Sequence, residues 1–230
     1  MSRWRIWRVL GAGLAALFAA LAYSWLSLPD VRDLRRTNPT STAFMRLRAR
    51  EAQANGSQKR QVHRWISYSR ISPALAKAVR VAEDAGFWDH DGIDLGEIRA
   101  SIEDNWTKGS PLRGASTITQ QLAKNLYLSP ARNPYRKVTE LLITRRLEAE
   151  LSKTRILELY LNLIEWGDGI WGAEAAAQTY FGVPASDLSN EQAALLAAAI
   201  ASPRTYNPAQ PSAALLRRQQ RILGRMGLSG

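Results

Sequence analysis

The chain has 230 residues, of which 46% are hydrophobic, enough for one helical domain with a buried core and an appendage. It contains no cysteine, which excludes disulfides, thiolate metal sites and a cysteine nucleophile. Its formal net charge of +11 favours anionic partners, namely nucleic acid, an acidic membrane surface or a phosphorylated substrate.

The first predicted element is an apolar run near the N-terminus. Residues 9–28 carry no charged side chain and are long enough to cross a hydrocarbon core of about 30 Å. We expect residues 1–8 to be a cytoplasmic tail and residues 9–28 a transmembrane helix. A cleaved signal peptide is the alternative, because Ala20-Leu21-Ala22 fits a small-x-small cleavage site. Under either interpretation the rest of the chain is exported, so we expect a membrane partner and no nucleic acid.

A polar stretch follows the apolar run. Residues 29–60 show little apolar periodicity, which predicts a linker containing one short basic helix near residues 43–54. We therefore expect the folded domain to span residues 61–230.

The stretch 81–92, with the sequence VAEDAGFWDHDG, brings acidic and aromatic residues to the end of a helix. Ser72-Pro73 predicts the start of this helix and Gly86 its break, so Glu83 lies in the last turn, beside the aromatic pair at positions 87 and 88. A carboxylate among aromatic rings is partly desolvated, which raises its pKa and makes it a better proton acceptor. A solvated helix end is the alternative interpretation.

The next elements are a helix and a loop. Asp94 and Glu97 form a capping-box pattern that predicts a helix running to about Trp106. Residues 108–114 are rich in helix breakers and cations, which indicates either a mobile flap over a cleft or an ordinary connector.

A second helix with a polar face is predicted within residues 114–128. Ser116 is its expected cap, and apolar residues recur at four-residue intervals on one side. Hydroxyl, amide and ammonium groups line another face and its flank: Thr117, Gln120, Gln121, Lys124 and Asn125. Such a row suits sugar hydroxyls and phosphate oxygens, although a merely solvated polar face has the same pattern.

The third helix, residues 136–148, combines two cations with a carboxylate. Arg136 and Glu140 share one face, and Lys137 lies beside them. An exposed Arg–Glu pair contributes less than about 1 kcal/mol to stability, so the fold does not require this pair. Two cations beside a carboxylate instead suit a pyrophosphate clamp with a second acid.

The remaining elements read mainly as scaffold. Residues 153–162 form a helix that is apolar on most sides and is therefore expected to be buried, which requires internal partners for Glu158 and Asn162. An alanine-rich helix then runs through Ile200. The last helix, residues 211–226, has a basic face that meets either lipid phosphates or solvent.

Five of these stretches together resemble the signatures of the peptidoglycan glycosyltransferases, glycosyltransferase family 51. The matching patterns are E-D-x-x-F-x-x-H-x-G from Glu83, G-x-S-T-I-T-Q-Q-L-x-K-N from Gly114, R-K-x-x-E from Arg136, K-x-x-I-L-E-x-Y-L-N from Lys153, and the loop at residues 202–208. They occur in the family's order and spacing. No transpeptidase sequence follows them, as in the monofunctional form of the family.

The resemblance implies a mainly α, lysozyme-like domain with a small membrane-proximal lobe. It implies an enzyme that polymerises lipid II into glycan strands, by inverting transfer from an undecaprenyl-pyrophosphate-linked donor strand to the 4-hydroxyl of the N-acetylglucosamine in an acceptor lipid II. Such an enzyme is a single-pass protein of the inner (cytoplasmic) membrane with its catalytic domain on the periplasmic side.

The resemblance also implies roles for particular residues. Glu83 is the expected catalytic base, Glu140 is the second catalytic acid, and Lys124, Arg136 and Lys137 hold the pyrophosphate. The expected substrate-binding residues around the sugars are Asp84, Phe87, His90, Thr117, Gln120, Gln121 and Asn125. No protein metal site and no obligatory cofactor is expected, while a divalent cation, Mg or Mn, is compatible with Glu140. Lipid II, the growing strand and proteins of cell-wall synthesis or division are the expected partners.

Two other classes of function stay open at this point. A membrane-anchored lytic transglycosylase or muramidase shares the fold and the catalytic glutamate, but it needs an acid at the glycosidic oxygen and has no use for a cation cluster. A nonenzymatic cell-wall scaffold, which recruits partners through its anchor, needs no base at position 83.

Overall fold

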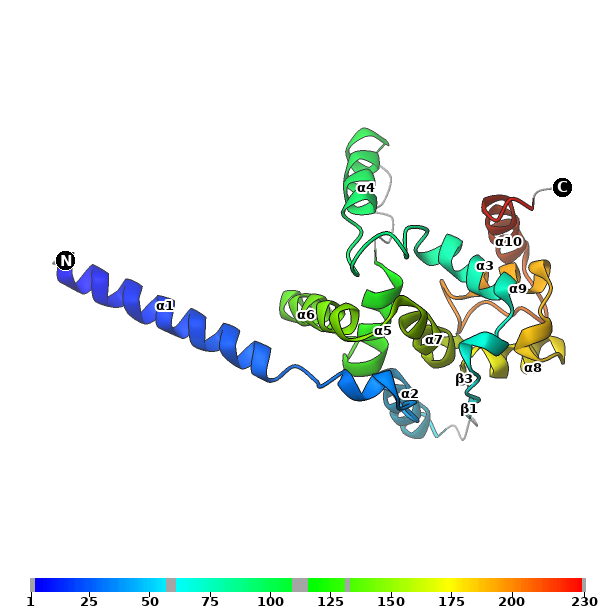
Figure 1. The fold of residues 1–230 in the computed structure, drawn as a ribbon, viewed down its shortest axis with the longest axis horizontal. Coiled ribbons are helices and arrows are strands. Elements are labelled where there is room, and N and C mark those ends of the chain that lie inside the picture. The colour runs from blue at the N-terminus through cyan, green and yellow to red at the C-terminus, as the bar shows by residue number, and fades with distance from the viewer. Residues whose placement is uncertain (1–2, 57–60, 109–115, 131–132, 229–230) are drawn as a thin grey trace.

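The computed structural model describes residues 3–56, 61–108, 116–130 and 133–228. These residues form a mainly helical molecule with one small sheet (Figure 1), which confirms the predicted α class. The lysozyme-like arrangement stays a prediction. The α-helices are α1 (Arg3–Leu26), α2 (Ala43–Ala54), α3 (Pro73–Glu83), α4 (Leu95–Lys108), α5 (Ile118–Tyr127), α6 (Pro134–Glu150), α7 (Lys153–Leu163), α8 (Ala173–Phe181), α9 (Asn190–Ala199) and α10 (Ala213–Arg225).

Short 3-10 turns and strands connect these helices. The turns are η1 (Arg32–Arg35), η2 (Tyr68–Arg70) and η3 (Ala185–Asp187). The sheet has the order β1-β3-β2, in which β1 (Val62–His63) runs parallel to β3 (Ile170–Trp171), and β2 (Glu165–Gly167) runs antiparallel to β3. The sheet therefore joins the start of the predicted domain to the turn that follows α7.

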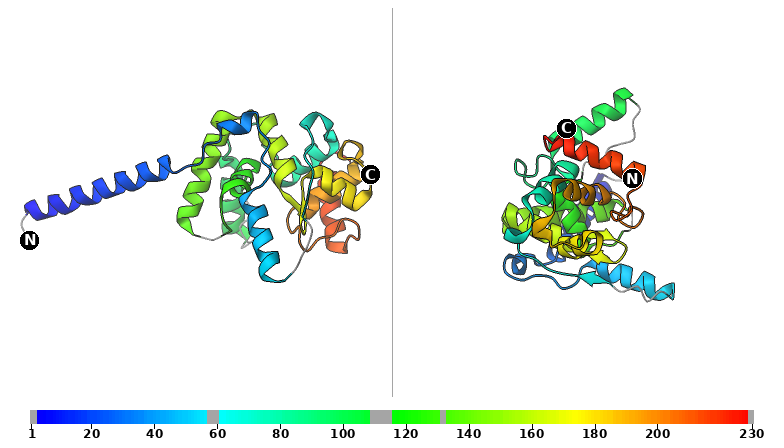
Figure 2. Two further views of the ribbon diagram at one scale, coloured as in Figure 1. Left: turned by 90° about the horizontal axis from the view of Figure 1, so that it is seen from below. Right: turned by 90° about the vertical axis from the view of Figure 1, so that its right-hand side faces the viewer.

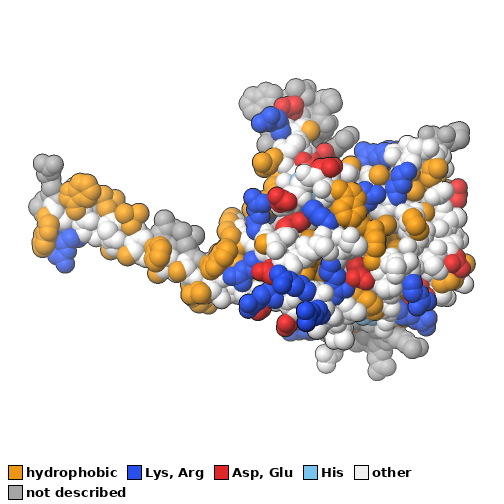
Figure 3. All heavy atoms as spheres, in the orientation of Figure 1, with side chains coloured by type: hydrophobic (Ala, Val, Ile, Leu, Met, Phe, Trp, Pro, Cys, Tyr) orange, Lys and Arg blue, Asp and Glu red, His pale blue; other side chains and the backbone are white. Residues whose placement is uncertain are grey.

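Helix α1 projects away from the rest of the molecule (Figures 1 and 2). Large apolar side chains along it are exposed, among them Trp7, Leu14 and Phe18 (Figure 3). Within the described part of the chain, no helix combines the length and the apolar character needed to cross a membrane. The transmembrane helix predicted at residues 9–28 stays a prediction.

The segment predicted as a linker packs against the domain. It contains η1 and α2, and α2 coincides with the short basic helix expected near residues 43–54. Three apolar side chains of the segment and one just before it, at position 28, are buried: Leu28, Val31, Leu34 and Met45. Arg155 of α7 adds polar contacts, because its guanidinium donates to the backbone oxygens of Leu34 and Thr37, each at 2.8 Å. These four apolar side chains thus belong to the hydrophobic core of the molecule.

The core joins two groups of helices. Helix α9 is buried along residues 193–199 and packs against α3 and α10, since its alanines allow close approach. Helix α7 packs against α5, which also contacts α6. As predicted, α7 is buried and its polar residues have internal partners. Asn162 pairs with both backbone groups of Ile66, and Glu158 accepts from Tyr68 N at 2.8 Å.

Helix α4 follows the stretch 84–94 and extends away from the body of the molecule (Figure 1). Its start agrees with the prediction, because Glu97 N donates to Asp94 Oδ1 at 2.8 Å. The predicted flap at residues 108–114 falls, apart from its first residue, outside the described residues.

Candidate active site

Glu83 ends helix α3 and faces helix α5. Its Oε2 accepts a hydrogen bond from Gln121 Nε2 at 2.8 Å. Burial raises the pKa of the Glu83 carboxyl above its ordinary value of 4.5, and the Gln121 hydrogen bond and the charges of Arg218 and Lys124 partly offset this effect. The direction is the one expected from the sequence, and it makes the carboxylate a stronger base than an exposed glutamate.

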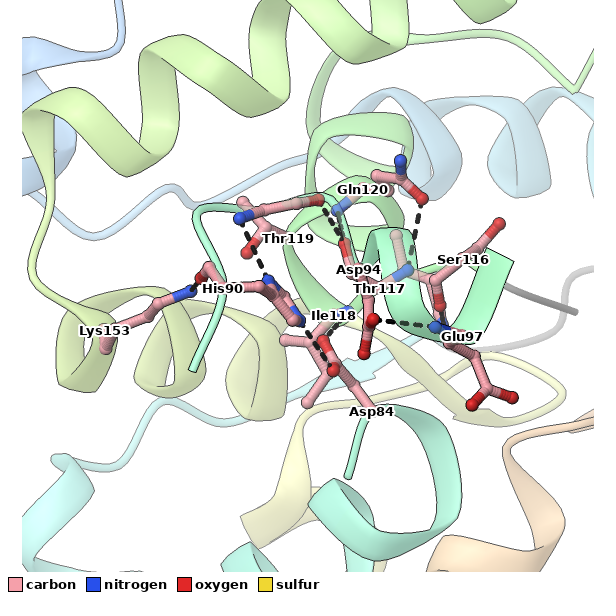
Figure 4. Close-up of polar contacts among 12 residues, drawn as sticks. Asp84, His90, Asp94, Glu97, Ser116, Thr117, Ile118, Thr119, Gln120 and Lys153 are labelled. Atoms are coloured by element: carbon pink, nitrogen blue, oxygen red, sulfur yellow. Dashed lines mark hydrogen bonds and ion pairs between the residues drawn. The ribbon is translucent and has the colours of Figure 1, made fainter. Parts of the chain in front are cut away.

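Asp84, the next residue, ties the end of α3 to the start of α5 (Figure 4). Its Oδ2 accepts from Ile118 N at 2.9 Å, so the carboxylate lies at the positive N-terminus of α5. Its Oδ1 lies 2.9 Å from His90 Nε2. Because Gly92 N donates to His90 Nδ1 at 3.1 Å, Nδ1 is the acceptor of the ring and Nε2–H donates to Asp84. Both side chains therefore hold the fold of this stretch.

Thr117 and Gln120 form a reciprocal capping box at the start of α5. Thr117 Oγ1 accepts from Gln120 N at 3.2 Å, and Gln120 Oε1 accepts from Thr117 N at 3.1 Å. The cap is thus Thr117 and not Ser116, because only Thr117 has a glutamine three residues ahead to complete the box. Both side chains are buried and have partners within the protein, although the sequence predicted them to bind substrate.

The stretch 84–92 is also fixed by Lys153, from the start of α7. Lys153 Nζ donates to His90 O at 2.5 Å and to Glu148 Oε1 at 2.9 Å, and it lies 4.6 Å from the centre of the Phe87 ring. Phe87 is fully buried and packs in the hydrophobic core, so it anchors this stretch to the fold. Gly92 has φ +81°, and a Cβ there would lie 2.6 Å from Thr144 Cγ2, which explains the glycine.

Helix α6 carries a group of opposite charges. Arg136 Nη1 lies 2.7 Å from Glu140 Oε2, and Lys137 Nζ lies 2.5 Å from Glu140 Oε1. Unlike the exposed pair assumed from the sequence, the Glu140 side chain is only 4% exposed, whereas Lys137 is 46% exposed. Arg136 Nε is buried and lacks a hydrogen-bond partner in the described part of the chain, so donor capacity is left over.

Lys124 of α5 connects the two groups electrostatically. Burial lowers the pKa of its ammonium, the charges of Glu140 and Glu83 act to raise it, and those of Arg136 and Lys137 act to lower it. Both carboxylates are thus close enough to act on this one cation. No hydrogen bond or ion pair joins Lys124 Nζ to another described residue, which leaves the ammonium free for an anionic ligand.

Asn125 is the last of the predicted site residues, and three further residues lie near the site without having been predicted there. Asn125 Nδ2 donates to Gln121 O at 2.8 Å, within helix α5. The sequence analysis missed Tyr160, Arg218 and Lys153 as parts of the site. Lys153 and Tyr160 are fixed positions of the pattern K-x-x-I-L-E-x-Y-L-N, but that stretch was interpreted as scaffold, and Arg218 is one arginine among several on a basic helix.

A cluster of potential metal ligands begins at Asp84, the residue after Glu83. Ligand atoms of Asp84, His90 and Asp94 are within 4.8 Å of one another. The residues fit a cation poorly, because both oxygens of Asp84 and both ring nitrogens of His90 already take part in hydrogen bonds. Glu140 is likewise occupied by Arg136 and Lys137. No step of the reaction is therefore assigned to a metal ion.

The fold and the site agree with a family of sugar-transferring enzymes. A family model described as "Transglycosylase" matches residues 50–227. The chain therefore belongs to the transglycosylase family, and the predicted class of enzyme, a glycosyltransferase, is confirmed.

Similar proteins carry a more specific name. A biosynthetic peptidoglycan transglycosylase of Azoarcus sp. is 50% identical over 203 residues, which cover 87% of this chain and 87% of the relative. The protein of the same name from Nitrosospira multiformis is 44% identical over 224 residues, covering 97% and 96%. That from Laribacter hongkongensis is 47% identical over 222 residues, covering 96% of each chain. The resemblance to the peptidoglycan glycosyltransferases is thereby confirmed.

Proposed function

We propose that this transglycosylase acts in peptidoglycan synthesis and polymerises lipid II into glycan strands. It transfers the donor strand from undecaprenyl pyrophosphate to the 4-hydroxyl of the N-acetylglucosamine in an acceptor lipid II, with inversion at the anomeric carbon. The observation that carries the proposal is a buried carboxylate with raised pKa, Glu83, whose charge acts on Lys124, a cation without an ion pair to any described residue. The charges of Arg136 and Lys137, which are bound to Glu140, act on the same ammonium.

Glu83 acts as the base in this proposal. A sugar hydroxyl is a weak nucleophile, so the reaction needs a group that takes its proton as the new bond forms. Burial makes Glu83 suited to this step, and the Gln121 hydrogen bond keeps one carboxylate oxygen in place. The other oxygen, Oε1, is then the atom that accepts the proton.

The cations serve the leaving group. Pyrophosphate needs its developing negative charge stabilised more than it needs a proton. Lys124 and Arg136 have donor capacity left within the described structure, and the half-exposed Lys137 can turn to a ligand. Glu140 orients Arg136 and Lys137, because each of its oxygens bonds one of them.

The same cluster argues against a strand-cleaving enzyme. A lytic transglycosylase or muramidase needs a protonated acid at the glycosidic oxygen. Both oxygens of Glu140 are instead bonded by the cations Arg136 and Lys137, a cluster for which a strand-cleaving enzyme has no use. We therefore propose that this enzyme synthesises glycan strands and does not cleave them.

We further propose that the enzyme is a single-pass protein of the inner membrane, with its catalytic domain on the periplasmic side. Support comes from the uncharged run at residues 9–28, the exposed apolar side chains of α1, and the Lys and Arg side chains near its base (Figure 3). Helix α4, with Leu95 exposed, belongs to the membrane-proximal lobe in this proposal. An alkaline phosphatase fused to the C-terminus should be active in cells, and activity of a cytoplasmic reporter there instead would contradict the topology.

The decisive experiment compares lipid II polymerisation by the full chain and by two variants. Glu83→Gln should lose about 10²–10⁴-fold in the rate of polymerisation, which is the usual contribution of a general base. Glu140→Gln should lose a large part of the wild-type rate. Glu191→Gln, at an exposed position on α9, is the matched control and should behave as the wild type. Wild-type turnover in Glu83→Gln would refute the mechanism and leave a scaffold role. Shortened sacculi without polymer would indicate the lytic enzyme.

A further inference from the structure

A chain of two hydrogen bonds leads from the buried helix α7 to the proposed base. Tyr160, which is fully buried, donates from its hydroxyl to Gln121 Oε1 at 2.9 Å. Gln121 Nε2 then donates to Glu83 Oε2 at 2.8 Å. The three side chains come from α7, α5 and α3, so the contacts depend on the packing of all three helices.

The direction of these hydrogen bonds follows from their chemistry. An ionised carboxylate only accepts, so Gln121 must present its amide nitrogen to Glu83. The amide oxygen then faces Tyr160, whose hydroxyl must donate. Burial, together with the charges of Glu83 and Asp84, raises the pKa of the Tyr160 hydroxyl well above its ordinary value of 10.0, so the proton stays on the tyrosine.

Without the hydroxyl, the amide oxygen of Gln121 loses its partner, and among the described contacts only those of Nε2 with Glu83 Oε2 and, at 3.4 Å, with Ser116 O still orient the amide. The oxygen and the nitrogen are nearly equal in size, so the amide turns over more easily than in the wild type. A reversed amide would direct its oxygen at Glu83 Oε2. Two acceptors at hydrogen-bond distance repel each other unless the carboxyl is protonated, and a protonated Glu83 is no base.

We propose that Tyr160 is a positioning residue, which fixes the orientation of the Gln121 amide so that Glu83 is held as an ionised base. The inference rests on the proposed role of Glu83 in lipid II polymerisation. Tyr160 itself touches neither substrate nor reacting atoms in this proposal. It acts only through Gln121.

Other charged groups also face Glu83 and set the background for a test. Asp84 follows it on the same element and raises the pKa of the Glu83 carboxyl, whereas Lys124 from α5 and Arg218 from α10 lower it. All three are unchanged when the Tyr160 hydroxyl is removed. A difference in pH dependence between wild type and Tyr160→Phe therefore reports on the hydroxyl and the amide it orients.

The test is the pH dependence of kcat/KM for lipid II polymerisation by full-length wild type and Tyr160→Phe. We expect the acid limb to move to higher pH, with a loss of about tenfold on that limb, a much smaller loss on the alkaline side, and little change in KM. Tyr180→Phe is the control, because it removes a hydroxyl that contacts Trp166 O at 3.4 Å, in β2. Its profile should coincide with that of the wild type.

A second variant keeps the inference testable if Tyr160→Phe folds poorly. Gln121→Met removes the donor to Glu83 while Tyr160 stays in place, and it should move the acid limb in the same direction. An unmoved acid limb in either folded variant, or an equal loss at every pH, overturns the inference if Glu83→Gln is inactive. Activity of Glu83→Gln would instead show that the assignment of the base is at fault.

Discussion

At the scale of single residues, the burial that suits Glu83 to its proposed role as base lowers the stability of the fold. Its pKa in the folded protein is raised by burial above the ordinary value of 4.5, so the native state binds the proton more tightly than the unfolded chain does. The free energy of unfolding therefore falls as pH rises from the ordinary pKa through the raised one, and it stays lower above that range. Below the ordinary pKa both states are protonated and the cost disappears.

This sign leads to a prediction for Glu83→Gln. The variant lacks the buried charge, so its melting temperature should exceed that of the wild type at pH 8, and the gain should shrink toward pH 4. Thermal melting of both proteins at the two pH values measures the effect. Glu191→Gln should show no such gain, because hydrogen bonding lowers the pKa of that exposed carboxyl. A gain of equal size at pH 4 and pH 8 would mean that the charge is not its cause.

The sequence predicts the position of Glu83 in its helix better than it predicts the contacts of the Glu83 side chain. The last-turn position of Glu83 follows from a start signal and a breaker within the same helix, so local rules suffice. Its contact with Gln121 depends on how α3 packs against α5, and no local pattern carries that information. The sequence therefore predicts either substrate binding or solvation for the polar face of α5, whereas Gln121 contacts Glu83 and Thr117 caps the helix.

At the scale of elements, the stretch between α3 and α4 is held in place by contacts with other helices. Its residues Asp84 and His90 bond each other and the start of α5, and Lys153 of α7 contacts both His90 O and Glu148 of α6. Thr119 Oγ1 donates to the same Glu148 oxygen at 2.5 Å. Three helices, α5, α6 and α7, thus meet at one ion pair, which fixes the stretch that follows Glu83.

Lys153→Met should therefore weaken both the fold and the activity. The Glu148 side chain, which is only 7% exposed, would keep Thr119 as its donor but lose its counter-ion, and breaking such a pair costs about 3 kcal/mol. Urea unfolding measures the loss. Lys77→Met is the control, since Lys77 Nζ bonds only a backbone oxygen, that of Met226, in the described structure, and its loss should cost less than about 1 kcal/mol.

A double variant separates the ion pair from general damage to the core. Adding Glu148→Gln to Lys153→Met removes the uncompensated charge, so the double variant should be more stable than the sum of the two single changes implies, by at least about 1 kcal/mol. Strict additivity would show that the two side chains do not act as a pair.

At the scale of the whole molecule, the sequence placed the start of the folded unit too far along the chain. Residues 29–60 lack periodicity because their buried apolar side chains occur singly, in a 3-10 turn and at the ends of short elements. A hydrophobic pattern needs repeats to be visible, whereas burial of an isolated Val31 or Leu34 depends on the surface that the rest of the fold provides. The helix at residues 43–54 could be predicted because its 12 residues are long enough to show a pattern.

This packing gives the connection between α1 and the domain a defined geometry. Arg146 of α6 donates to the backbone oxygens of Trp25, Leu28 and Pro29, and its guanidinium lies 4.8 Å from the centre of the Trp25 ring. Residues 28–34 then continue into the core. These contacts would hold the proposed anchor at a set distance from the site, which suits the membrane-bound substrate proposed for the enzyme.

Leu34→Ala distinguishes a packed arm from a loose linker. Leu34 is 6% exposed, and truncation of a buried leucine costs about 2–5 kcal/mol because a cavity remains. The full chain in detergent should thus unfold at a lower urea concentration. Leu14→Ala, on the exposed side of α1, removes the same atoms and should stay within about 0.5 kcal/mol of the wild type. Equal midpoints for Leu34→Ala and wild type would mean that the arm unfolds independently, and the distance from anchor to site would then vary freely.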